Sequence, residues 1–256
     1  MRKQTTFFKQ MRTALLMCLV GNGLLAQQHP SLDNYLFTPV AISPAHAGMQ
    51  GKDVVSLVDA QLVGVAGAPR TGLLSADFKT LNGLGINIMA ISDALGPMST
   101  GQLAISSAYH LPINEEWNLS TGLRATVSRT SIDLNSEIFY DGLDPSIYTL
   151  AGPFIANIDI GTTLNGQNAY FGLSYKNVNR AQIYQNNYTA QIFHLFAGYT
   201  QTLNKEWSIR TSFLATGTTN SPGDLNLHAF LEHKNSWGLG AHYSPSDEMG
   251  MMLKIN

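Results

Sequence analysis

Residues 117–127 read WNLSTGLRATV, and their alternation decides the fold class. The odd-numbered positions place one set of side chains on one face of a strand: Trp117, Leu119, Thr121, Leu123, Ala125 and Val127. The even-numbered positions place a smaller and more polar set on the other face: Asn118, Ser120, Gly122, Arg124 and Thr126. Strict alternation over this length is the signature of a β-strand whose two faces meet different surroundings. A strand of about ten residues is also long enough to cross a bilayer at a tilt.

Similar segments recur along the chain and predict about twelve strands. They cover residues 53–62, 70–80, 83–92, 99–111, 117–129, 155–165, 168–176, 191–203, 206–217, 224–233, 236–244 and 248–256, of which the first two alternate poorly. Short turns are expected at Asn82-Gly83, 114–116, Asn165-Gly166, 204–206 and 234–236, and both Asn-Gly dipeptides suit two-residue turns with positive φ. Longer connections are expected at 63–69, 93–98, 130–154, 177–190, 218–223 and 245–247. Outer-membrane barrels alternate short and long connections in this way.

Composition favours a membrane barrel over a secreted β-sandwich or soluble barrel. Charged residues make up only 12% of the chain, and the polar strand face carries mainly Gly, Ser, Asn and Thr. The wet face of a soluble sheet usually carries many Lys and Glu residues. No stretch after residue 26 has the long apolar run of a spanning helix. We therefore predict an all-β, antiparallel transmembrane β-barrel of about twelve strands.

The sequence also predicts where the tryptophans and the charged side chains of the strands lie in this barrel. Each tryptophan directly follows a short turn, which predicts a periplasmic aromatic girdle made of Trp117, Trp207 and Trp237. The segments LPINEEWNLS (111–120) and QTLNKEWSIR (201–210) resemble each other around two of these turns. Candidate lumen charges are Arg124, Asp159, Lys176, Arg210, Glu232 and Lys254, and opposite signs among them are expected to pair across the lumen. Such charges are either functional or structural.

The first 26 residues are predicted to be a secretory signal peptide. They hold Arg2, Lys3, Lys9 and Arg12 before an apolar run, with Ala26 at the expected cleavage position. Without them the chain keeps 11 basic and 17 acidic residues, a net charge of −6, which argues against nucleic-acid binding. Cys18 is the only cysteine and would leave with the signal, so disulfides and cysteine chemistry are not expected in the mature chain.

Neither catalytic nor metal-binding motifs stand out in the sequence. There is no G-x-S-x-G, and the seven histidines form no H-x-H or H-x-x-x-H pair. We therefore predict that the protein is not an enzyme and has no catalytic residues, no metal and no cofactor. A barrel lipid hydrolase is a remote alternative, in which His242 would act with Ser174 or Ser212.

Three ordered blocks of the sequence carry a family resemblance. In SLDNYLFTPVAISPAHAG (31–48), the matching residues are Tyr35, Phe37, Pro39, Pro44, Ala45, Ala47 and Gly48. In QLVGVAGAPRT (61–71) they are Gln61, Gly64, Gly67, Ala68, Pro69 and Thr71, and in GLGINIMAISDALGP (83–97) they are Gly85, Asp93, Gly96 and Pro97. These blocks resemble the PorP/SprF family of type IX secretion system outer-membrane proteins, and the sequence departs from that family at Leu62, which replaces a Trp, and at its end, which lacks a terminal aromatic residue.

The sequence predicts three regions: the signal peptide (1–26), an extended periplasmic or plug segment (27–52), in which Pro39 and Pro44 disfavour a helix or a central strand, and the barrel (53–256). The resemblance implies 14 strands in full-length family members. It implies a place in the outer membrane and a role in exporting or retaining large secreted proteins of the gliding-adhesin type, recognised through their carboxy-terminal domains. Implied partners are outer-membrane lipid, the translocon, its periplasmic ring components and one secreted protein. The matched residues would be structural or would dock partners. The alternative from another class is a passive solute porin.

Overall fold

The computed structural model describes residues 33–36, 38–49, 53–61, 68–133, 149–184, 187–219, 223–234, 236–245 and 249–255. The predicted signal peptide and the motif residues Phe37, Gly64 and Gly67 lie outside these ranges. Within these ranges the chain forms four short 3₁₀ helices: η1 (Asp33–Leu36), η2 (Pro39–Ala41), η3 (Pro44–His46) and η4 (Leu81–Gly83). Within the described residues, no helix is long and apolar enough to cross a membrane.

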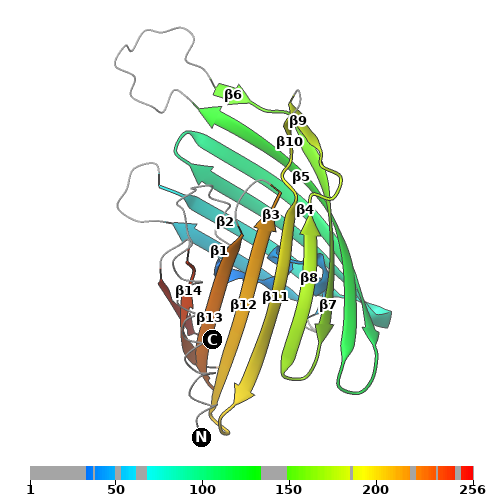
Figure 1. The fold of residues 1–256 in the computed structure, drawn as a ribbon, viewed down its shortest axis with the longest axis vertical. Coiled ribbons are helices and arrows are strands. Elements are labelled where there is room, and N and C mark those ends of the chain that lie inside the picture. Colours follow the sequence, from blue (N-terminus) through cyan, green and yellow to red (C-terminus); the bar gives the residue numbers. More distant parts are fainter. Residues whose placement is uncertain are drawn as a thin grey trace, which may run out of the picture.

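Twelve strands form one antiparallel sheet in which sequence neighbours are also spatial neighbours (Figure 1). In order they are β1 (Val54–Gln61), β2 (Arg70–Lys79), β3 (Leu84–Leu95), β4 (Met98–Pro112), β5 (Asn118–Asp133), β7 (Ile155–Asn165), β8 (Ala169–Lys176), β11 (Ile192–Thr202), β12 (Trp207–Thr218), β13 (Asp224–His233), β14 (Trp237–Tyr243) and β15 (Gly250–Ile255). All twelve predicted strands are confirmed, including the first two.

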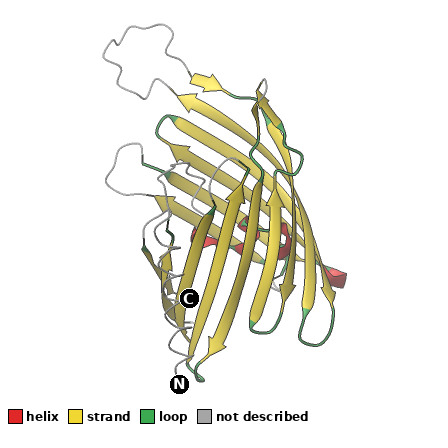
Figure 2. Cartoon of the chain, viewed as in Figure 1, coloured by secondary structure: helices red, strands yellow, loops and turns green. Residues whose placement is uncertain are grey.

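Among the described residues, three further short strands lie in connections where no strand is predicted. β6 (Thr149–Ala151) extends the sheet beside β5, and β9 (Gln182–Tyr184) pairs with β10 (Asn187–Tyr188) as a separate ribbon. The main sheet curves strongly, as Figure 2 shows, and β1 and β15 are its two edge strands. In the described part of the chain these two edges do not pair, so the sheet is curved like a barrel wall without being closed.

The two faces of the sheet have the polarity of a membrane barrel, inverted relative to a soluble sandwich. The convex face carries large exposed apolar side chains such as Leu103, Leu123 and Ile105, with exposed fractions of 66%, 60% and 54%. The concave face buries small and polar residues, among them Asn87 and Thr163. An apolar outside and a polar inside fit lipid on the convex face.

Two predicted connections differ from the structure. The expected long connection at 93–98 is a two-residue turn, because Leu95 pairs directly with Met98 and only Gly96 and Pro97 lie between the strands. The predicted positive-φ turn at Asn165-Gly166 is also wrong: Asn165 still belongs to β7, and neither residue has positive φ. There the side chain of Asn165 donates to Ser120 Oγ on the neighbouring strand, and the turn follows at 166–168.

By contrast, Asn82 and Gly83 both take positive φ, 65° and 77°, as the dipeptide predicts.

Residues 33–36 and 38–49 lie against the concave face of the sheet, and we call them the inner segment (Figures 1 and 2). They coil into η1, η2 and η3 where an extended chain is expected. Pro39 and Pro44 each begin a 3₁₀ helix, a position where the missing N–H of proline costs nothing. Ser43 caps η3 by accepting a hydrogen bond from the backbone N–H of Ala45 at 3.3 Å.

Candidate functional site

The inner segment is the most deeply buried part of the described chain. Ile42, Ser43, Ala45 and Ala47 have no exposed surface, and Tyr35 is only 2% exposed. Burial on all sides means that the segment is covered both by the strands beneath it and by the strands facing it. It therefore fills the space between β4–β7 and β11–β13 at this level.

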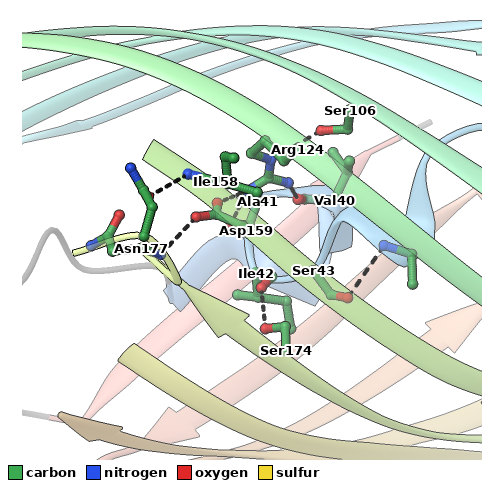
Figure 3. A network of polar contacts seen from close by, with 12 residues as sticks. Val40, Ala41, Ile42, Ser43, Ser106, Arg124, Ile158, Asp159, Ser174 and Asn177 are labelled. Atoms are coloured by element: carbon green, nitrogen blue, oxygen red, sulfur yellow. Dashed lines mark hydrogen bonds and ion pairs between the residues drawn. The ribbon is translucent and has the colours of Figure 1, made fainter. Parts of the chain in front are cut away.

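The strands beneath the segment bind its backbone carbonyl groups one after another (Figure 3). Arg124 on β5 donates to the carbonyls of Val40 and Ala41, the latter at 3.3 Å. Ser174 on β8 donates to the carbonyl of Ile42 at 2.6 Å. These contacts satisfy carbonyls that the short helices leave without an intrahelical partner.

Two more strands bind the end of the segment. His110 Nε2 on β4 donates to the carbonyl of Ala47 at 2.8 Å, while its Nδ1 accepts from Ser120 Oγ at 2.7 Å. Asp77 Oδ1 on β2 accepts from the backbone N–H of Gly48 at 2.8 Å. Gly48 has φ +69° and an ideal Cβ there would overlap the β3 backbone, so only glycine suits this end of the segment.

Arg124 is held in place by its own partners on the sheet. Its Nε donates to Ser106 Oγ at 3.0 Å, and its Nη1 lies 3.6 Å from Asp159 Oδ2 on β7. Asp159 in turn accepts from the backbone N–H of Asn177 at 2.9 Å. Both charged side chains are almost completely buried, with 2% and 4% of their surface exposed. A buried ion pair of this kind is costly unless hydrogen bonds satisfy both partners, as they do here.

A row of small residues gives the segment room to approach the sheet. The strand registers place Gly85, Ala108, Gly122, Gly161 and Ser174 side by side from β3 to β8. A Cβ on Gly122 would lie 2.5 Å from the carbonyl carbon and oxygen of Pro44. One on Gly161 would overlap Ser43 Oγ, and one on Gly85 would overlap the carbonyl oxygen of Ala47. The row is thus shaped to the backbone of the segment.

On the opposite side, β11–β13 hold the segment by side chains. The Tyr35 hydroxyl hydrogen-bonds Ser212 Oγ at 2.9 Å, and its ring meets His228 edge-on with centroids 4.8 Å apart. Tyr35 and Ile42 form one buried cluster with Phe196 and Leu214. This side makes apolar and aromatic contacts in place of backbone recognition.

His46 lies between the two sides of the site. Its ring packs against Phe196 with centroids 5.3 Å apart. Complete burial lowers the pKa of His46 to about 4, so the ring is neutral at pH 7. The site therefore contains a single buried cation, Arg124, in direct contact with the inner segment among the described residues.

The other predicted lumen charges also face inward but pair along the wall. The expectation of pairing across the lumen is not met: Arg210 and Glu232 lie on adjacent strands 3.4 Å apart. Lys254 reaches Glu232 at 2.6 Å from two strands away, passing Gly238 on the strand between. Lys176 follows Tyr175, which pairs with Ile160, so Lys176 lies on β8 beside Asp159 of β7. Neighbouring strands bring side chains within reach of each other, whereas the filled interior separates opposite walls.

The three tryptophans lie on the convex face at the end of the sheet where the short turns are. The ring centroids of Trp207 and Trp237 are 5.5 Å apart, and His233 lies against both. Trp117 contacts Gly166 of the next turn. Their position agrees with an aromatic girdle, and the periplasmic side of that girdle stays a prediction.

The similar segments around Trp117 and Trp207 form the same turn. In each, the Asn side chain accepts from the backbone N–H groups two and three residues later: Asn114 at 2.9 and 2.8 Å, and Asn204 at 2.8 and 2.9 Å. In both cases the Trp carbonyl accepts from the backbone N–H of the Asn and from that of the residue before the Asn. The sequence similarity thus reports a repeated turn structure.

The family-motif residues divide between the inner segment and turns. Tyr35, Pro39, Pro44, Ala47 and Gly48 belong to the inner segment, as described above. Of the others, Ala68 and Pro69 directly precede β2, and Gly96-Pro97 form the β3–β4 turn. Asp93, expected in that turn, lies within β3 and accepts from the Thr71 hydroxyl at 2.6 Å.

Reasoning from the sequence missed most of the residues that hold the segment: Asp77, Ser106, His110, Gly122, Gly161 and Ser174. Their one signal is a place on the small, polar strand face. The serines suggested as hydrolase nucleophiles are both occupied with the inner segment, Ser174 with Ile42 and Ser212 with Tyr35. No group of three or more His, Cys, Asp or Glu side chains that suits a metal occurs within the described ranges.

Comparison with known proteins gives a family match and structural matches to porins of low sequence identity. The family model of the type IX secretion system membrane protein PorP/SprF matches residues 24–256. A KdgM porin has 11% identity and a TM-score of 0.42, covering 78% of this chain and 95% of its own. A NanC porin has 9% identity and a TM-score of 0.42, covering 75% of this chain and 86% of its own. No curated protein matches the sequence.

Proposed function

Because this chain belongs to the PorP/SprF family of type IX secretion system membrane proteins, we propose that it is an outer-membrane component of that system. Its role would be to export or retain a particular large secreted protein of the gliding-adhesin type. Recognition would use the carboxy-terminal domain of that protein and no bond chemistry. The family match over residues 24–256 is the observation that carries this proposal.

The orientation of the strand faces supports a place in the outer membrane. Exposed leucines and isoleucines cover the convex face, while buried charges and hydroxyls such as those of Arg124, Asp159 and Ser106 are on the concave face. The predicted signal peptide would deliver the chain to the periplasm. The expected partners are outer-membrane lipid, the translocon, its periplasmic ring components and the secreted protein itself.

The test is deletion of the gene followed by quantification of every type IX cargo on the cell surface and in the medium. We expect one cargo, or a small group of related cargos, to disappear from the surface, and the wild-type gene to restore it. Tagged protein purified from outer membranes in mild detergent should then carry that cargo or type IX components, identified by mass spectrometry.

Normal amounts of all cargos after deletion would overturn the proposal. Loss of small-solute uptake with normal cargo levels would instead indicate the passive porin. A strain complemented with an Asp59→Ala variant is a suitable control, because Asp59 pairs only with Arg70 on the exposed face and should not affect secretion.

A further inference from the structure

The inner segment has the features of a seal. It is held against the row of small residues that includes Gly85, Gly122 and Gly161. Four of its residues have no exposed surface, so water reaches it neither from the β4–β7 side nor from the β11–β13 side. A path for ions between β4–β7 and β11–β13 would have to pass through the space that this segment fills. The closure therefore depends on what keeps the segment in place.

The strongest attachment is the Arg124 guanidinium. It binds two successive carbonyls of the segment, those of Val40 and Ala41. It is fixed from behind by Ser106 and Asp159. Hydrogen bonds to a charged donor are about twice as strong as neutral ones, and this one lies in a water-excluded setting.

The remaining attachments are neutral or lie at the ends of the segment. Ser174 contributes one hydroxyl bond to Ile42, and Tyr35 contributes one to Ser212. His110 and Asp77 bind the Ala47–Gly48 end. Among the described residues, Arg124 is the one charged side chain that donates hydrogen bonds to the middle of the segment.

We propose that the inner segment forms a latched seal, in which Arg124, positioned by Asp159, holds the segment on the Gly85–Gly122–Gly161 row and so keeps the protein closed to ions. Losing the latch frees the segment and opens an ion path along the concave face. This proposal is independent of the secretion role, since it concerns permeability alone.

The experiment compares full-length protein, purified and reconstituted in planar bilayers and in liposomes loaded with a potassium-sensitive dye. Wild-type protein should be nearly silent. Arg124→Leu should raise ion flux about tenfold or more, the population change expected from losing a charge-assisted hydrogen bond. Folding of each variant is checked by the heat-dependent shift in gel mobility that folded barrels show.

Arg210→Leu is the matched control. Arg210 is also an inward-facing arginine in an ion pair, but its partner Glu232 keeps Lys254 at 2.6 Å when Arg210 is removed. This variant should stay silent. Equal flux through Arg124→Leu and Arg210→Leu would overturn the proposal, because lost charge on the inner face would then explain the leak.

A second variant set avoids the charge altogether and serves if Arg124→Leu does not fold. Gly122→Ala places a methyl group against Pro44 and should push the segment from its seat, raising flux. Gly101→Ala on β4 is its control, because nothing lies within 4 Å of an added Cβ there. A folded, silent Gly122→Ala would contradict the proposal, as would wild-type flux equal to that of the variants.

A reversible lock completes the design. With Cys18 replaced by Ser, cysteines are placed at Ala41 and Ala104, which belong to the same buried cluster, and non-reducing gels establish that the disulfide has formed before flux is measured. In the Arg124→Leu background the oxidised form should be silent and the reduced form conducting. Flux that is insensitive to oxidation of this pair would show that the path does not run through the seat of the segment, against the proposal.

Discussion

The two halves of the sheet hold the same inner segment by different chemistry. The first half, β2–β8, binds the backbone of the segment. Arg124, Ser174 and His110 donate hydrogen bonds to its carbonyl groups, and glycines leave space for the chain to approach. The second half, β11–β13, contacts the side chains of the segment: Tyr35 bonds to Ser212 and belongs to the buried cluster around Phe196. Backbone recognition tolerates sequence change in the segment, whereas the aromatic contacts tie it to particular residues.

The halves also use their charges differently. In the first half, the Arg124–Asp159 pair is directed at the segment. In the second half, Arg210, Glu232 and Lys254 pair among themselves and connect the last strand, β15, to β12 and β13. Inward-facing charged side chains of one sheet therefore serve two purposes: some hold the inner segment, and others hold the edge strand β15.

The largest effect is expected where the first half would lose its buried ion pair. Asp159→Ala leaves the Arg124 charge buried without its carboxylate, which costs about 3 to 5 kcal/mol of unfolding free energy. Urea unfolding in detergent, followed by tryptophan fluorescence, measures it. Asp59→Ala is the control, since the Asp59–Arg70 pair is exposed and should contribute nothing measurable. If Asp159→Ala and Asp59→Ala lowered the unfolding free energy equally, the buried Arg124–Asp159 pair would stabilise the fold no more than an exposed pair does.

A smaller effect should follow from filling the glycine row. Gly85→Ala forces a methyl group against the Ala47 carbonyl, and overpacking of this kind costs about 1 to 3 kcal/mol. The same unfolding measurement tests it, with Gly217→Ala as the control because an added Cβ there meets nothing. If the two variants were equally stable, the row would not be a seat shaped to the segment.

The second half should respond less to loss of its polar contact. Tyr35→Phe keeps the ring in its cluster and removes only the hydrogen bond to Ser212, at a cost of about 0.5 to 1.5 kcal/mol. Tyr109→Phe on the exposed convex face controls for the change itself. A cost of Tyr35→Phe above that of Asp159→Ala would reverse the comparison between the halves.

The smallest effects should be equal in both halves, because each half contains one copy of the same turn. Asn114→Ala and Asn204→Ala each remove two hydrogen bonds to exposed backbone N–H groups, which water replaces in part, so each costs about 1 kcal/mol or less. Thermal unfolding of the two single variants measures the difference. Unequal costs would show that the turns differ in role despite their matching geometry.

Much of the fold could be predicted from the sequence because the two faces of a strand differ in polarity at alternate residues. The period of two placed Leu123 outside and Arg124 inside, and the structure agrees. Turn positions followed from Asn, Gly and the repeated Asn-x-Glu-Trp pattern. The errors at Gly96-Pro97 and Asn165-Gly166 arose because neighbouring strands, through their pairing, decide how far a strand continues into a turn.

About twelve antiparallel strands with an apolar and a polar face can be predicted from the amino-acid pattern alone, because that prediction depends on residues two positions apart. The folded chain was needed to find that Arg124 binds residues 83 and 84 positions away, and that glycines on separate strands lie in one row against the inner segment. These contacts depend on strand register and on the path of the inner segment. Both arise from packing among distant parts of the chain, which no local pattern encodes.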